Sequence, residues 1–390
     1  MTAGARPDAI ALTQSPVCCM MALPALLSVP FVTEALKMKH SMTRSRLALL
    51  LSVALLPALH AQQTEPPAAA TTHAIHIDAV VDTKSGQPVS KLAQSDFTLL
   101  DNKAARPITS FKVHTGETEP VNVIVLIDAV NTPYQMVAYA RSGIEKYLKS
   151  NEGQLAQPTA IAVLTDQGTQ IDSSFTKDGN SLGDSLEHHE IGLRQITRSA
   201  EWGGVERLQI CLKALEQLVA FVAASHQRTI AIWVTPGWPL ISGPQIYLDS
   251  KQQNQIFGQI VALSTRLREA NLTLYDVNPV GVQESLQRSD YYEVFLKGVS
   301  KPNQAQLGDL GIQVLASQTG GLVIEGNSDV AGMIQRCVTD TQTWYSIGFD
   351  PAPADKPNEY HHIELNVNQP GLAVRTRDGY YANPVAAPPR

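Results

Sequence analysis

The sequence predicts a doubly wound α/β domain with a mostly parallel six-stranded sheet, flanked by β segments at both ends. Residues 121–128 (VNVIVLID) form an apolar run that ends on Asp128. A run that is apolar on both faces is typical of a central parallel strand covered by helices on both sides. Strand and helix patterns alternate from residue 120 to residue 340, which indicates an α/β sheet. The flanking regions instead alternate like a half-buried antiparallel sheet.

The α/β domain is expected over residues 119–341. Its predicted strands cover 121–128, 159–165, 170–175, 229–235, 272–277 and 322–325, and its predicted helices cover 134–149, 205–224, 253–270, 307–319 and 329–341. Asn271 and Gly320-Gly321 lie where helices are expected to stop. In such sheets ligands bind where the carboxyl ends of strands lead into helices, and Asp128 lies at such a place.

The two flanking β segments cover residues 72–118 and 342–382. Each contains about three strands, too few to be stable alone. The simplest way to give both a core is to pack them into one β-sandwich, with the α/β domain inserted between them. Two independent β caps at opposite ends are the alternative.

The amino-terminal region has the pattern of an export signal. Basic residues from Lys39 to Arg46 precede the apolar run 47–56 and a small residue, Ala61. This order predicts a signal peptide over residues 38–61, since ten apolar residues are too few to span a membrane. We therefore expect a secreted or periplasmic protein with no membrane span after signal cleavage.

The regions around the signal peptide belong to no predicted domain. Residues 1–37 are interpreted as an extension from a wrongly assigned start codon, because a signal peptide is normally terminal. Residues 62–71 are a Pro/Ala-rich linker, and residues 383–390 are a tail.

Charge and cysteine content limit the class of partner. The chain has a formal net charge of −6, and residues 1–61 carry five Lys/Arg against two Asp/Glu, so cleavage leaves about −9. Nucleic-acid binding requires a basic face that neutralises phosphates, so an acidic mature protein argues against a nucleic acid as partner. Only Cys211 and Cys337 remain after cleavage. The sequence is compatible with a disulfide between them and with two buried, unpaired thiols.

Several short motifs occur in a specific order and spacing along the chain. The motifs are Gly86-Gln87-Pro88-Val89, Asp96-Phe97-Thr98-Leu99-Leu100-Asp101, Ile108–Phe111, Leu126-Ile127-Asp128-Ala129-Val130-Asn131-Thr132, Trp344-Tyr345-Ser346-Ile347-Gly348-Phe349 and Val374-Arg375-Thr376-Arg377-Asp378-Gly379-Tyr380-Tyr381. Their order and spacing resemble those of von Willebrand factor type A-related proteins of the acidobacterial type, and the resemblance covers nearly all of residues 72–382. It implies an exported protein with a Rossmann-like type A domain between β segments.

Type A domains commonly hold a divalent cation in a metal-ion-dependent adhesion site, built from a D-x-S-x-S loop, a Thr and an Asp. Such oxygen ligands suit Mg²⁺. Here Asp128 matches the first carboxylate and Thr132 the second hydroxyl, but Val130 replaces the first hydroxyl. Val205 and Pro236 replace the Thr and the Asp. The resemblance therefore implies a degenerate site without a cofactor, in which Asp128 accepts backbone hydrogen bonds or caps the next turn.

The same resemblance defines a candidate binding surface on three predicted loops. The second loop is the turn Trp202-Gly203-Gly204-Val205. The candidate residues are Asp128, Asn131, Thr132, Trp202, Gly203, Gly204, Thr235 and Trp238. Exposed aromatic side chains on these loops, with Tyr247 nearby, suit protein recognition. The alternative is that the aromatic side chains fill the space left by the lost metal ligands.

One further motif has the pattern of a catalytic site. Gly179-Asn180-Ser181-Leu182-Gly183 matches the G-x-S-x-G pattern of a nucleophile elbow, which requires a buried strand before it and a His nearby. The preceding residues are polar, so Asp178 to Ser181 is better interpreted as a turn and a helix cap.

These observations favour an exported, non-catalytic protein-binding or scaffolding module, with a protein as partner. A metal-dependent adhesion protein that binds Mg²⁺ through Asp128 and Thr132 is the first alternative. A serine hydrolase using Ser181 is the second.

Overall fold

A mostly parallel sheet forms the centre of the chain. The structure is a computed structural model that describes residues 74–189, 201–225, 227–239, 247–280 and 291–384. In spatial order the strands are β11 (Val323–Ile324), β10 (Leu272–Val277), β9 (Thr229–Val234), β5 (Asn122–Asp128), β6 (Gln154–Thr165) and β7 (Gly168–Ile171), and β8 (Thr176–Asp178) also pairs with β6. Strands β11 to β6 are parallel, and β7 and β8 are antiparallel to β6. The predicted α/β fold class is confirmed.

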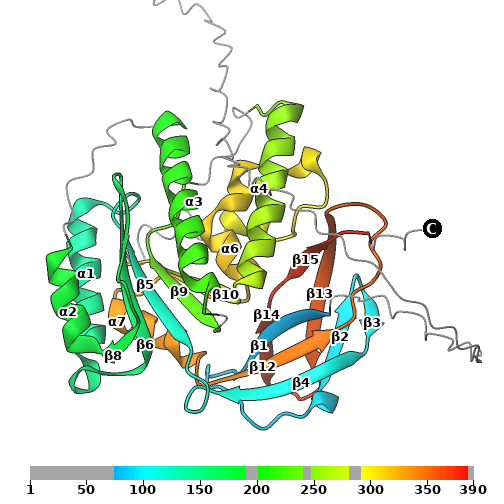
Figure 1. The fold of residues 1–390 in the computed structure, drawn as a ribbon, viewed down its shortest axis with the longest axis horizontal. Helices are drawn as coiled ribbons and strands as arrows, with labels where there is room; N and C mark the ends of the chain where they lie inside the picture. The colour runs from blue at the N-terminus through cyan, green and yellow to red at the C-terminus, as the bar shows by residue number, and fades with distance from the viewer. Residues whose placement is uncertain (1–73, 190–200, 226, 240–246, 281–290, 385–390) are drawn as a thin grey trace, which may run out of the picture. The chain divides into compact units, whose positions relative to one another are not determined.

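Helices cover both faces of this sheet (Figure 1). On one face lie α1 (Tyr134–Leu148), α2 (Gly179–His188) and α7 (Val330–Thr339), and on the other α3 (Glu201–Ala223), α4 (Ser250–Glu269) and α6 (Ile312–Gln318). Along β5, Ile124 and Leu126 pack toward α3, whereas Val125 and Ile127 pack toward α1. Burial on both faces explains why the β5 sequence is apolar without interruption.

The flanking segments form two antiparallel four-stranded sheets that share one core. One sheet has the order β14 (Leu372–Thr376), β1 (Ile75–Thr83), β12 (Thr343–Phe349), β4 (Ile108–Thr115), and the other the order β15 (Gly379–Ala382), β13 (Glu359–Val367), β2 (Phe97–Asp101), β3 (Ala104–Arg106). Each sheet combines strands from both ends of the chain. The core between them includes Ile77, Phe97, Tyr345 and Leu365. The two β segments therefore pack together, as the sandwich arrangement requires, and do not form separate caps.

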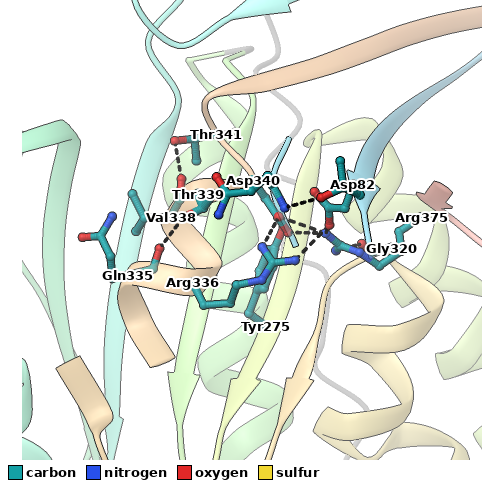
Figure 2. A network of polar contacts seen from close by, with 12 residues as sticks. Asp82, Tyr275, Gly320, Gln335, Arg336, Val338, Thr339, Asp340, Thr341 and Arg375 are labelled. Atoms are coloured by element: carbon teal, nitrogen blue, oxygen red, sulfur yellow. Dashed lines mark hydrogen bonds and ion pairs between the residues drawn. The ribbon is translucent and has the colours of Figure 1, made fainter. Parts of the chain in front are cut away.

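A buried ionic cluster joins the β sheets to the α/β domain (Figure 2). Arg375 on β14 places Nη2 2.8 Å from Asp340 Oδ2 and 2.9 Å from Asp82 Oδ2. Arg336 on α7 pairs with the same two carboxylates, at 2.7 and 2.9 Å. Tyr275 on β10 donates its hydroxyl to Asp340 at 2.8 Å. Because the partners come from both parts, the cluster fixes one part against the other.

The two cysteines of the described residues are free and buried. Cys211 on α3 belongs to the core on one face of the parallel sheet, and Cys337 on α7 belongs to the core on the opposite face. The sheet separates the two thiols, so of the two alternatives the structure has buried, unpaired thiols.

Several predicted segments lie outside the described residues, namely the extension 1–37, the signal peptide 38–61, the linker 62–71 and most of the tail 383–390. Within the described ranges, no helix combines the length and the apolar character needed to cross a membrane.

Candidate functional site

Asp128 lies at the carboxyl end of β5 and is fully enclosed by its own fold. Its Oδ1 accepts hydrogen bonds from the backbone N–H groups of Val130 and Asn131, both at 2.9 Å. Its Oδ2 accepts from Asn131 Nδ2 at 2.8 Å and from Trp233 Nε1 at 3.1 Å. Both carboxylate oxygens therefore already hold two donors each, and the side chain has no exposed surface.

Opposing effects act on the charge of Asp128. Burial raises the pKa of this carboxyl above its usual range, whereas hydrogen bonds from Asn131, Trp233 and Thr235 lower it. The four donors favour the ionised form. These hydrogen bonds offset the cost of burying the carboxylate, as is expected for a side chain with a structural role.

The residues present do not fit the cation that the family resemblance implies. Asp128 has no free oxygen lone pair facing an open position, and Thr132 is buried with its hydroxyl unpartnered. Val130, Val205 and Pro236 supply no side-chain oxygen at the other positions. In the part of the chain that is described, no group of three or more His, Cys, Asp or Glu side chains is placed to hold a metal.

Trp238 fills space beside this carboxylate and is not on the surface. It packs edge-on against Trp233, with ring centroids 5.0 Å apart and planes at 75°. Thr235 is also buried, and its hydroxyl accepts the Gly237 N–H at 3.2 Å. Of the two interpretations of Trp238, the structure supports the one in which the ring occupies the region of the missing ligands.

The predicted turn at Trp202–Val205 is wrong. These residues lie at the start of α3, which includes Glu201, and Gly203 and Gly204 are buried there. Two glycines suggest a turn because each costs a helix about 1 kcal/mol relative to Ala. The apolar packing of the rest of α3, through Leu208 and Leu215 for example, outweighs that cost.

Ser181 does not have the surroundings of a nucleophile. It is exposed in the first turn of α2, where Asp178 caps the helix by accepting the Asn180 and Ser181 N–H groups at 3.0 and 3.1 Å. Among the described residues no His is hydrogen-bonded to Ser181. The interpretation of this motif as a turn and a helix cap agrees with the structure.

Other side chains at this edge of the sheet were not expected from the sequence. Asp276 is buried within β10, and Gln313 is buried on α6. Tyr134, the first residue of α1, and Val294, which follows β10 in the chain, are exposed. An acid inside the apolar run 272–277 is a signal that points to Asp276, whereas nothing in the sequence marks Gln313.

Comparison with known proteins gives a likeness of fold. No family model matches the sequence, and no curated protein matches it. Among solved structures, the human COPII-coat protein Sec24c aligns at 10% identity and a TM-score of 0.32, over 68% of this chain and 44% of that one. Proximal thread matrix protein 1 from the mussel byssus aligns at 10% identity and a TM-score of 0.32, over 56% and 47%. The chain spans less than half the length of either structure.

Proposed function

We propose that this protein is a non-catalytic binding module that acts after export and binds a protein through the carboxyl edge of its parallel sheet. One observation carries the proposal. Five large hydrophobic side chains are exposed among the described residues. Three of them lie between a strand that ends at this edge and the following helix, or at the first residue of that helix. These three are Tyr134, Tyr247 and Val294, at 59%, 86% and 65% exposure.

The three side chains follow strands that are neighbours in the sheet. Tyr134 follows β5, Tyr247 follows β9, and Val294 follows β10. The three strands are neighbours in the sheet, in the order β10, β9, β5, and they run parallel. Their carboxyl ends therefore lie side by side, and the three connections start from adjacent points.

The chemistry of this edge suits a protein partner. Tyr side chains offer a large contact area at a low cost in side-chain entropy, and Tyr is enriched among residues that dominate binding energy. The closed surroundings of Asp128 offer no open metal position. Binding at this edge is therefore expected to depend on the exposed Tyr side chains and not on a cation at Asp128.

Site-specific photo-crosslinking in the producing cells tests the proposal. A photoreactive amino acid replaces Tyr247 or Tyr134 in two variants, and Glu269 in the control. Glu269 has a side chain 63% exposed at the end of α4, just before β10, and thus at the opposite edge of the sheet. We expect a discrete crosslinked protein from positions 247 and 134 and none from 269. Equal yields at all three positions, or no crosslink at any, would contradict the proposal.

The export part of the proposal rests on the pattern of residues 38–61. Mature protein beginning at Gln62 is expected in the periplasmic or extracellular fraction, and amino-terminal sequencing identifies it. Protein that keeps residues 38–61 and stays in the cytoplasmic fraction would contradict export.

A further inference from the structure

Buried polar atoms without hydrogen-bond partners gather at the carboxyl edge. Thirteen such side-chain atoms occur among the described residues, and six of them belong to this edge. The six are Asn131 Oδ1, Thr132 Oγ1, Trp238 Nε1, Asp276 Oδ1, Asp276 Oδ2 and Gln313 Oε1. Buried polar groups are nearly always satisfied in folded proteins, so a local concentration requires a specific cause.

Asp276 is the centre of this group. It is 0% exposed, and neither carboxylate oxygen has a partner. Its register partner on β9 is Trp233, and alternation along β10 directs Asp276 to the face covered by α4 and α6, because Leu272 and Leu274 pack there. Asp276 therefore points into the layer between the sheet and these helices.

Gln313 approaches the same region from α6. This helix packs directly on β10, where the Leu274 N–H donates to Thr319 Oγ1 at 3.0 Å. The Gln313 amide lies against the turn after β9, so close that a Cβ on Gly237 would stand 2.0 Å from Nε2. Gln313 is 5% exposed, and its Oε1 has no partner. Trp238, in the same turn, packs on the register partner of Asp276.

The unpartnered atoms and their surroundings favour a positive ligand. Four of them are pure acceptors, namely the two Asp276 oxygens, Gln313 Oε1 and Asn131 Oδ1. Burial raises the pKa of Asp276 well above its usual range, and the charges of Glu325 and Asp128 raise it further. Glu325 directly follows β11, which pairs with β10. A proton would satisfy one carboxylate oxygen only, whereas a cation engages both of them together with the amide oxygen.

We propose that Asp276 and Gln313 hold a hard cation between β10 and α6, with Glu325 contributing the second negative charge. The class includes Ca²⁺, Mg²⁺ and Mn²⁺, which take carboxylate and amide oxygens and fill the remaining positions with water. This site is separate from Asp128, whose oxygens are already saturated. The cation is structural, because the side chains that bind it are enclosed, and it fixes α6 on the sheet.

Terbium luminescence tests this site. Tb³⁺ is a hard cation that emits when a nearby indole is excited, and Trp233 and Trp238 lie beside Asp276. The full-length purified protein is titrated with Tb³⁺, and Ca²⁺, Mg²⁺ and Mn²⁺ are then added as competitors. We expect a saturable signal of one ion per chain, displaced by at least one competitor, and more than tenfold weaker binding in Asp276→Asn. Asp355→Asn, an exposed control, should bind within about twofold of the wild type. Asp128→Asn should weaken binding less than Asp276→Asn does, because Asp128 acts on the site only through its charge.

Two results would overturn the proposal. One is an unchanged titration in Asp276→Asn, or loss of the signal in Asp128→Asn alone. The other is the absence of any saturable signal in the wild type, which would leave a protonated Asp276 with no cation. Gln313→Glu gives a second test that misfolding cannot mimic, because it predicts a gain of binding. Its added charged oxygen should tighten Tb³⁺ binding about tenfold. Unchanged affinity in Gln313→Glu would also contradict the site.

Discussion

Replacing Asp128 by Ala removes the common acceptor of four hydrogen bonds at the end of β5. The donors are the Val130 and Asn131 N–H groups, Asn131 Nδ2 and Trp233 Nε1, at 2.8 to 3.1 Å. If Asp128 is an internal acceptor, the loss destabilises the protein whether or not a metal is present. If it is a metal ligand, the loss has little effect on the metal-free protein, because it removes an uncompensated charge.

The magnitude follows from the donors left behind. A buried donor without a partner costs about 1–3 kcal/mol. Asn131 is only partly buried and can turn toward water, so about two donors carry the cost. Removing one partner of a buried charged network costs about 3–5 kcal/mol. We expect Asp128→Ala to lower the free energy of unfolding by about 3–5 kcal/mol, a large fraction of the roughly 5–15 kcal/mol of a typical domain.

Urea unfolding in EDTA, followed by circular dichroism, measures this change. Asp355→Ala is the matched control, because Asp355 is exposed and should change the free energy by less than about 0.5 kcal/mol. A loss below about 1 kcal/mol in EDTA, together with a larger loss when Mg²⁺ is added, would refute the reasoning and restore Asp128 as a metal ligand.

Three further predictions concern stability and the thiols. Asp340→Asn should lower the free energy of unfolding in urea by about 3–5 kcal/mol, because Arg375 loses its buried partner; an unchanged midpoint would show that the cluster of Figure 2 contributes nothing. Burial raises the pKa of Asp309 from 3.8 to about 6. Because the pKa of Asp309 is higher in the folded protein than in the unfolded one, this carboxyl contributes its full stabilisation below pH 4. The contribution is lost as pH rises through 6, and the free energy of unfolding falls by at most about 3 kcal/mol. In Asp309→Asn the free energy of unfolding should depend less steeply on pH than in the wild type, and an unchanged slope would contradict this. Cys211 and Cys337 should react with Ellman's reagent only after unfolding; fast reaction of native protein would contradict their burial.

The fold could be predicted because its signals are local and repeated. The apolar run at 121–128 reports burial on both faces of a sheet, and β5 covers Asn122–Asp128. The boundary of α3 could not be predicted in the same way. Gly203 and Gly204 lower helix propensity locally, but packing of the rest of this 23-residue helix decides the outcome.

The site was harder to predict because it depends on contacts between distant segments. The replacements at Val130 and Pro236 predict a degenerate metal position from the sequence alone. That Trp233 donates to Asp128 requires β9 to lie next to β5, which residue spacing alone does not establish. Gln313 approaches Gly237 only after α6 packs on the sheet. Pairings of this kind are properties of the assembled fold.

The protein-binding claim is tested most directly by the affinity for the partner that is crosslinked at position 247. Isothermal titration compares the wild type with the double variant Tyr134→Ser/Tyr247→Ser, and Glu269→Ser is the control. Loss of two dominant contacts, each at least about 2 kcal/mol, predicts binding at least about 100-fold weaker in the double variant, even allowing for non-additivity. The control should bind within twofold of the wild type. Equal affinity of the double variant and the wild type would contradict binding through the carboxyl edge.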